Sequence, residues 1–456
     1  MASTVEATLS AAAPPGRDAA RFATMRQRFT ARFLVVGDRA GTVVPDGVLD
    51  VADGAIAWVG PAAEAPPQGD AEVVALPGVL TPGLVNAHSH APMVLFRGQG
   101  EGLPLDRWLR EVMWPREARL TPEDVEVAMT AASAEMLGNG ITTSVEMYFH
   151  PERIAAAVTT TGARAVIATP LLPLPGMPPM AEQLAASVAL AVAAPDDGTV
   201  EYGIGPHAAY TVPLPVLADA AHAAREHGLL LHLHVAETAT EGAGLLAAHG
   251  LSVPALLASH DVLGGRVLAA HCVHLDDGDL ELWQEYDVAV AHCPASNAKL
   301  ASGVAPLRPM LDRGLRVGLG TDGPASNDSL DLLADLRLAA GLARLRERSA
   351  TALTAAEAFW LATGGAADAL GRPDLGRLET GRRADLVHVD TRDLAFEPVG
   401  DAGDVLAHLV WSGAGRHVRD VWVGGRPVVR DGASTTVDVD ALRVDVAARA
   451  ARLAAG

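Results

Sequence analysis

Hydrophobic residues along this chain follow two different patterns. Residues 51–59 are apolar on both sides of the pair Asp53-Gly54, which predicts a β-hairpin that turns at this pair. Residues 384–389 and 418–423 are similar short apolar segments, and a Gly-Gly pair follows the second of them. Because strands lie near both ends of the chain, we expect one small β-sandwich domain assembled from the two termini.

Between residues 81 and 384, apolar segments that predict strands alternate with Ala- and Leu-rich segments that predict helices. One helix is well marked, because Thr121 can cap it, Pro122 suits its first turn and residues 138–140, Gly-Asn-Gly, end it. This α/β alternation is typical of a parallel sheet with crossover helices, and a (β/α)8 TIM-type barrel is its natural closed form. We expect barrel strands near residues 81–87, 141–148, 164–170, 200–207, 229–237, 267–274, 288–294 and 315–322.

The length of 456 residues suits one large barrel with a small second domain. The first residues are rich in Ala, Ser and Pro without a sustained period, and they lack the early basic residue and apolar core of a signal peptide. We therefore expect a flexible leader (1–28), the β-sandwich domain (29–80 with 385–435), the barrel (81–384) and a C-terminal helix (436–456).

The formal net charge of -20 and a pI near 5.2 argue against a nucleic-acid partner, because neutralising phosphates requires a basic surface. Cys272 and Cys293 are the only cysteines and form no CxxC pair, which is typical of a reducing compartment. Every apolar run is interrupted well before the roughly 20 residues that a membrane helix needs. We expect a soluble, cytoplasmic protein with a small-molecule substrate and neither a nucleic-acid nor a membrane partner.

Histidine and carboxylate residues gather at the ends of the predicted strands. His88 and His90 close the first barrel strand, where alternate side chains face the same side, so that both imidazoles can reach one metal ion. His234 and Asp322 each end another apolar strand, and a buried carboxylate without a cationic partner would cost several kcal/mol. Taken alone, a His-x-His pair can be part of a hydrogen-bonded core without a metal ion, and an aspartate can simply cap a turn or a helix. Together they lie where a barrel carries its catalytic groups.

Three histidines and one aspartate suit a borderline metal ion such as zinc, with iron as the alternative, and leave room for the water of a catalytic site. Glu237 follows His234 by three residues and places a carboxylate beside the ligands. His271 ends a further strand, and the pattern leaves two roles open to it, either a fifth ligand or a base next to the bound water.

The only lysine of the chain, Lys299, bears on the number of metal ions. Two-metal barrels of this kind usually bridge their ions with a carboxylated lysine on a middle strand. Lys299 instead lies beyond the strand that ends at residue 294. The sequence therefore predicts a site for a single ion.

These residues belong to motifs that resemble the amidohydrolase superfamily. The likeness runs from about residue 30 to 435 and is closest to the branch of the methylthioadenosine/S-adenosylhomocysteine deaminases, with triazine hydrolases and guanine deaminases as near relatives. Thr81–Met93 resembles the metal loop of that branch, and five later motifs follow in its order: Gly205–His207, His234–Thr238, Ala270–Leu275, Pro294–Asn297 and Gly320–Gly323.

The resemblance implies a role for each candidate residue. It would make His88, His90, His234 and Asp322 the metal ligands, Glu237 the proton shuttle, and His271 together with Asp322 the residues that position the attacking hydroxide. Trp108, Glu117 and His207 match positions that surround the nucleoside in the deaminases, and Glu117 would hold the ribose hydroxyls. Simpler interpretations exist for two of them: Trp108 as a core residue, and Glu117 as a solvated salt bridge to Arg116 or Arg119. The likeness also implies a homo-oligomer.

One departure from the family pattern bears on the substrate. Members that accept the homocysteine group hold its carboxylate with an arginine where this chain has Thr169, and no arginine occurs between Arg164 and Arg225. We therefore expect a zinc-dependent deaminase of a neutral nucleoside such as 5'-methylthioadenosine, 5'-deoxyadenosine or adenosine. The alternatives are a deaminase or chlorohydrolase of another heterocycle (guanine, 8-oxoguanine, triazine or pterin) and a catalytically silent scaffold.

Overall fold

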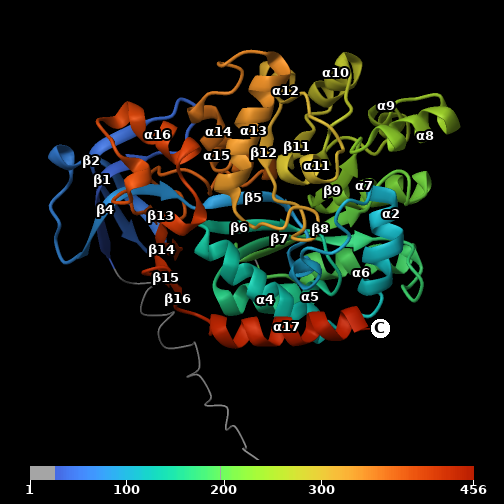
Figure 1. Ribbon diagram of the computed structural model, residues 1–456, viewed down its shortest axis with the longest axis horizontal. Helices are drawn as coiled ribbons and strands as arrows, with labels where there is room; N and C mark the ends of the chain where they lie inside the picture. Colours follow the sequence, from blue (N-terminus) through green and yellow to red (C-terminus); the bar gives the residue numbers. More distant parts are fainter. Residues whose placement is uncertain (1–25, 196, 456) are drawn as a thin grey trace, which may run out of the picture.

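The computed structural model describes residues 26–195 and 197–455, and most of the expected leader lies outside the described residues. Two sheets make up its framework (Figure 1). The central one is a nearly closed parallel barrel surrounded by helices. In the other, the first strands of the chain, in blue, lie beside the last strands, in red.

The barrel contains eight strands in chain order, which confirms the TIM-type fold. The barrel is closed by a hydrogen bond between the segments of its first and last strands, in which the main-chain N–H of Asp322 donates to the carbonyl of His88 at 3.0 Å. Both residues are candidate metal ligands. The strands are β5 (Leu84–Ser89), β6 (Ile141–Glu146), β7 (Arg164–Leu171), β8 (Val200–Pro206), β9 (Leu230–Val235), β10 (Arg266–His271), β11 (Ala289–His292) and β12 (Val317–Leu319).

Helices connect the barrel strands and bury their apolar faces against the outside of the barrel. The expected helix is α4 (Pro122–Gly138), and Thr121 and Asp124 cap it by exchanging side-chain and main-chain hydrogen bonds. The other helices around the barrel are α5 (Pro151–Thr161), α6 (Met180–Ala193), α7 (Leu214–His227), α8 (Ala239–His249), α9 (Val253–Ser259), α10 (Asp277–Glu285), α11 (Pro294–Lys299), α12 (Leu307–Asp312), α13 (Leu332–Glu347), α14 (Ala355–Leu361) and α15 (Gly364–Leu370).

The chain ends form one mixed eight-stranded sheet, in the order β16-β15-β14-β13-β4-β1-β2-β3. The sheet curls on itself, because Phe29 on β1 meets Trp422 on β14 with ring centroids 5.0 Å apart although two strands lie between them. It thereby encloses a small core of its own, as the expected sandwich would. Its strands are β1 (Gln27–Val35), β2 (Val43–Ala52), β3 (Ala55–Pro61), β4 (Glu72–Pro82), β13 (Leu386–Val389), β14 (Val418–Val423), β15 (Arg426–Arg430) and β16 (Ala433–Ser434).

Two further helices follow the barrel in the chain, α16 (Ala402–Trp411) and α17 (Val439–Ala455). The last of these, in red, runs along α4 (Figure 1). Arg449 donates to the Asp124 carboxylate at 2.7 Å, and Arg452 pairs with the same carboxylate. Burial would raise the pKa of Asp124, but the two arginines and the hydrogen bonds from Thr121 outweigh this effect and lower it to about 2. The end of the chain is therefore anchored to the first barrel helix by a buried acid.

Within the described residues, no single helix is both long and apolar enough to cross a membrane. The bent pair formed by α8 and α9 meets the length and composition criteria when its two helices are taken together.

Candidate metal and catalytic site

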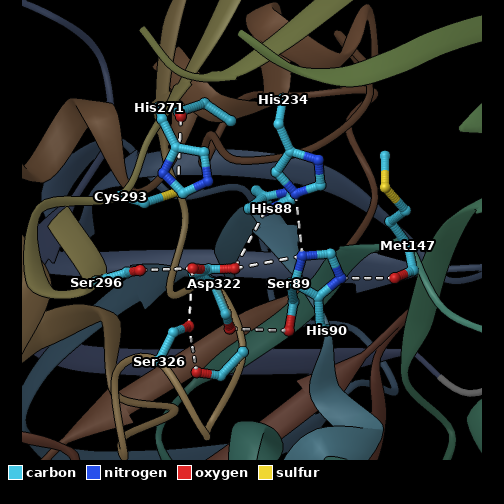
Figure 2. A network of polar contacts seen from close by, with 12 residues as sticks. His88, Ser89, His90, Met147, His234, His271, Cys293, Ser296, Asp322 and Ser326 are labelled. Carbon is cyan, nitrogen blue, oxygen red and sulfur yellow. Dashed lines mark hydrogen bonds and ion pairs between the residues drawn. The ribbon is translucent and has the colours of Figure 1, made fainter. Parts of the chain in front are cut away.

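Three imidazoles converge at the carboxyl edge of the barrel (Figure 2). His88 lies in β5, His90 directly after it and His234 in β9, and each offers a nitrogen within 4.8 Å of the other two. Oδ1 of Asp322 lies 3.3 Å from His88 Nε2 and 3.4 Å from His90 Nε2. The four expected ligands therefore face one point, which is the arrangement that a metal ion requires.

Hydrogen bonds on the far side of each imidazole leave its Nε2 atom free for a ligand. His90 Nδ1 lies 2.6 Å from the Met147 carbonyl, and His234 Nδ1 lies 2.8 Å from the His207 carbonyl, so both Nδ1 atoms carry the proton. Burial lowers the pKa of His88, His90 and His234, which keeps the rings neutral. His88 Nε2 is buried without a hydrogen-bond partner among the described residues. An orphaned lone pair in such a cluster fits a metal ion.

Asp322 is held by two serines. Its Oδ2 atom accepts from Ser296 Oγ at 2.6 Å and from Ser326 Oγ at 2.8 Å, as Figure 2 shows. The residue lies three positions beyond the short strand β12 and has a positive φ of 58°, which turns its carboxylate into the barrel mouth. Because the serines satisfy one oxygen, the other remains directed at the imidazoles.

Glu237 is buried beside the cluster, and burial raises the pKa of its carboxyl. The turn that carries it is fixed by Glu241, whose carboxylate accepts from the main-chain N–H groups of Ala236, at 3.2 Å, and Glu237, at 2.8 Å. Ala236 has a positive φ of 50°, a strained conformation for alanine. Glu241 therefore supports the turn that positions Glu237.

His271 ends β10 next to Glu237. Its Nε2 atom lies 3.9 Å from Glu237 Oε2, and its Nδ1 atom lies 2.9 Å from Asn297 Oδ1. Burial disfavours the charged ring, but the carboxylates of Glu237 and Asp322 outweigh this effect and raise the pKa of His271. With His88 and Cys293 it also forms a second group that could hold a metal ion. This placement suits either of the two roles expected from the sequence.

A narrow inner cavity opens above the cluster, and the expected substrate residues Trp108, Glu117 and His207 line it together with Glu237 and His271. Trp108 is buried, with Nε1 donating to the Gln99 carbonyl at 3.3 Å, so it belongs to both the core and the cavity wall. It begins a π-helical turn, Trp108–Met113, between the short helices α2 (Leu105–Arg107) and α3 (Trp114–Glu117). Such turns are frequently found at functional sites.

Glu117 makes no ion pair with Arg116 or Arg119 in the described part of the chain, so the solvated salt bridge considered from the sequence is wrong. It accepts instead from Tyr148 Oη at 2.8 Å, and burial raises the pKa of its carboxyl to about 7. His207 Nδ1 lies 2.8 Å from Thr211 Oγ1, and burial lowers the pKa of His207 to about 3. Both residues present polar atoms to a sheltered space.

Thr169 lies outside the inner cavity and lines a second, wider one of about 890 Å³. The two cavities share Trp114, Glu117, Phe149 and Pro170 in their walls. Thr169 Oγ1 is buried without a hydrogen-bond partner among the described residues. The wider cavity thus continues the inner one past the end at which Glu117 lies.

Lys299 lies away from the imidazole cluster. Its Nζ atom donates to the Ala325 carbonyl at 3.0 Å and pairs with Asp328. The ammonium group at the end of α11 is therefore engaged by these two partners.

Sequence reasoning missed several residues that support the site. They are His232, behind His88; Glu241, under the turn of Glu237; Asn297, beside His271; and Ser296 and Ser326, beside Asp322. Two of them carried a usable signal. His232 alternates with His234 along one strand, and Glu241 follows Glu237 by one helical turn.

Metal-dependent hydrolases built on a barrel place their ligands and their proton-transferring group at this edge, and the geometry described above defines the chain as one of them. The chain belongs to the Amidohydrolase family, whose sequence model matches residues 79–428.

Individual relatives cover most of the chain. It is 38% identical over 414 residues to a 5-methylthioadenosine/S-adenosylhomocysteine deaminase from Pelotomaculum thermopropionicum, covering 90% of this chain and 95% of the relative. It is 38% identical over 356 residues to a 5'-deoxyadenosine deaminase from Methanothermobacter thermautotrophicus, covering 78% and 82%. Among solved structures, a zinc-bound adenosine deaminase from Xanthomonas campestris superimposes with a TM-score of 0.90 at 34% identity, covering 95% of this chain and 99% of that one.

Proposed function

We propose that this chain is a zinc-dependent hydrolytic deaminase of a neutral aminopurine nucleoside, such as 5'-methylthioadenosine, 5'-deoxyadenosine or adenosine. The observation that carries the proposal is the buried carboxyl of Glu237 beside three converging imidazoles, at the floor of a narrow cavity that continues into a wide one. The relatives named for these nucleosides support it.

His88, His90, His234 and Asp322 would hold one zinc ion, since each directs a nitrogen or oxygen atom at the same point. When bound, such an ion supplies a Lewis acid that lowers the pKa of water toward about 7. The absence of a lysine from the cluster supports a single ion.

Proton transfer falls to Glu237. In the overall reaction, water adds to the ring carbon that bears the amino group, and ammonia leaves from the same carbon. Glu237 would take a proton from the attacking water and give it to the adjacent ring nitrogen, and a second transfer to the amino group would release ammonia. The raised pKa of Glu237 suits a group that must both accept and donate a proton near neutral pH. His271, with Nε2 3.9 Å from Glu237, and Asp322 would orient the attacking oxygen.

The walls of the two cavities favour a nucleoside with a neutral 5' group. Trp108 offers an apolar face to the purine ring. Glu117 accepts a hydrogen bond from Tyr148, and the ribose hydroxyls would donate to the same carboxylate, either in place of Tyr148 or in addition to it. Beyond it, apolar side chains such as Leu174, Met177 and Leu190 line the wider cavity. Among its described lining residues the only guanidinium, that of Arg110, already pairs with Asp106 at 2.6 Å. A carboxylate on the substrate would find no free cation there.

Ammonia release from a panel of substrates tests the proposal. The panel contains 5'-methylthioadenosine, 5'-deoxyadenosine, adenosine and S-adenosylhomocysteine, together with guanine, 8-oxoguanine, a chlorotriazine and a pterin. The proposal expects the highest kcat/KM with one of the three neutral nucleosides. A higher value with a free base, triazine or pterin would contradict it in favour of the alternative heterocycles. Substoichiometric metal with no hydrolysis of any compound would favour a silent scaffold.

The oligomeric state of the protein and its cellular compartment remain predictions. Family likeness suggests a homo-oligomer, which light scattering of the purified chain would measure directly, and the composition of the chain favours a cytoplasmic location.

A further inference from the structure

His232 is a buried histidine of β9 that faces the imidazole cluster from behind. It lies two residues before His234, is fully buried, and lines neither of the two cavities. Its Nε2 atom lies 2.7 Å from His88 Nδ1, and its Nδ1 atom lies 2.8 Å from the Leu268 carbonyl on β10. The substrate therefore cannot reach the His232 ring, but His88 is hydrogen-bonded to it.

The direction of this hydrogen-bond chain follows from its end. A carbonyl oxygen only accepts, so His232 Nδ1 must carry the proton given to Leu268. A doubly protonated His232 would be a fully buried cation whose two hydrogen-bond partners are a carbonyl and another imidazole, without a carboxylate, and this is costly. His232 Nε2 is therefore an acceptor, and His88 Nδ1 donates to it.

This assignment leaves the lone pair of His88 on Nε2, which faces the cluster. His90 and His234 reach the same state by donating to main-chain carbonyls, at 2.6 and 2.8 Å, whereas His88 depends on a side chain. The opposite tautomer of His88 has an alternative partner, because its Nε2–H would face Asp322 Oδ1 at 3.3 Å. That tautomer would present a proton to the metal position and engage the fourth ligand.

We propose that His232 is a positioning residue that holds His88 in its Nδ1–H tautomer, so that Nε2 is free to bind the metal ion. The inference rests on the metal site of the proposed function. Without the His232 acceptor, the His88–Asp322 contact becomes a hydrogen bond that competes with metal binding. The effect acts on metal affinity, and it does not depend on which substrate the enzyme turns over.

The test is the Zn²⁺ affinity of the metal-free full-length chain, measured by competition with a chromophoric chelator. His232→Leu keeps similar volume and removes both hydrogen bonds, whereas His232→Gln can donate to Leu268 through Nε2 and accept from His88 through Oε1. We expect the Leu variant to bind Zn²⁺ about 10–100-fold more weakly, the range for loss of a residue that supports a metal ligand, and the Gln variant to recover most of that affinity. His292→Leu, at another buried barrel histidine, serves as the matched control with unchanged affinity.

Wild-type affinity in His232→Leu, or equal losses in the Leu and Gln variants, would overturn the proposal. If neither variant folds, a ¹⁵N spectrum of the histidine-labelled, metal-free wild type decides: protonated Nδ1 in His88 supports the inference and protonated Nε2 overturns it. Because both readouts concern zinc and tautomers, they are separate from ammonia release. A failure of the proposed substrate class would leave them intact.

Discussion

The floor of the substrate cavity is carried by barrel strands, whereas its outer wall is carried by short helices, loops and one face of α6. At the floor, His88, His234 and His271 lie in or at the end of strands, and each ring is fixed by a hydrogen bond to its Nδ1 atom. The wall comes from the short helices of residues 105–117, from the loop after β7 and from α6, and mainly apolar and proline side chains surround about 890 Å³.

This difference separates two properties of the enzyme. The floor has little freedom, because moving one ring breaks a buried hydrogen bond, so it fixes the kind of reaction. The wall is built from packed apolar side chains, which can be substituted without loss of the fold, so it selects the group attached to the reacting ring. Changes at the floor should therefore abolish turnover, and changes at the wall should alter substrate preference. Four variants test this contrast.

The largest effect is expected at the floor. Glu237→Gln removes the proton-transferring group while keeping its shape, and we expect kcat on 5'-methylthioadenosine to fall by about 10²–10⁴-fold. Metal content should stay unchanged, because Glu237 is not one of the converging ligands. Glu182→Gln, in the outer wall, is the matched control with near wild-type kcat. A fully active Glu237→Gln enzyme would remove this residue from the mechanism.

Glu117 lies where floor and wall meet, and its replacement should act mainly on binding. Glu117→Gln is expected to lower kcat/KM for nucleosides by about 10–100-fold, the cost of a hydrogen bond to a charged group. Burial raises its pKa to about 7 in the wild type, so the carboxylate is lost as the pH falls through this value. KM should therefore rise below about pH 7 in the wild type and stay flat in the variant. Steady-state kinetics from pH 6 to 8.5 measure this, and parallel profiles would contradict the role.

A change confined to the wall should alter preference without harming the chemistry. Thr169→Arg places a cation in the wider cavity, and we expect kcat/KM for S-adenosylhomocysteine relative to 5'-methylthioadenosine to rise about tenfold. Thr169→Gln adds length without charge and should leave the ratio near that of the wild type. If both variants shift the ratio equally, the charge of the wall does not set the preference.

The smallest effect on activity is expected away from both regions. Asp124→Asn weakens the anchor between α4 and α17, and we expect it to lower the free energy of unfolding by about 1–3 kcal/mol at pH 7 while kcat/KM stays unchanged. Because the folded pKa of Asp124 is depressed to about 2, this stabilisation is present above about pH 4 and is lost as the pH falls toward 2. Denaturant unfolding measures it. An equal loss of activity would link the chain end to the site.

The sequence was sufficient for the features that depend on local pattern. The hairpin at Asp53-Gly54 and the helix from Pro122 to Gly138 form as expected, because turn and capping residues act within a few positions of themselves. The candidate ligands were found for a related reason. Parallel strands bring their carboxyl ends to one edge, so a histidine or aspartate that ends a strand is placed there by the fold class alone.

What surrounds those ligands was decided only by the tertiary structure. His90 lies just beyond β5, yet it still meets Asp322, because the turn after the strand directs it inward. Ser296 is separated from Asp322 by 26 residues, and His88 from His232 by 144. No helix or strand periodicity in the sequence relates residues that are so far apart. Their contact depends on how far each strand runs and how its loop turns back, and these are set by packing over the whole barrel. The sequence therefore determined which side chains are candidate metal ligands, and the folded barrel determined which neighbours fix their protons and their direction.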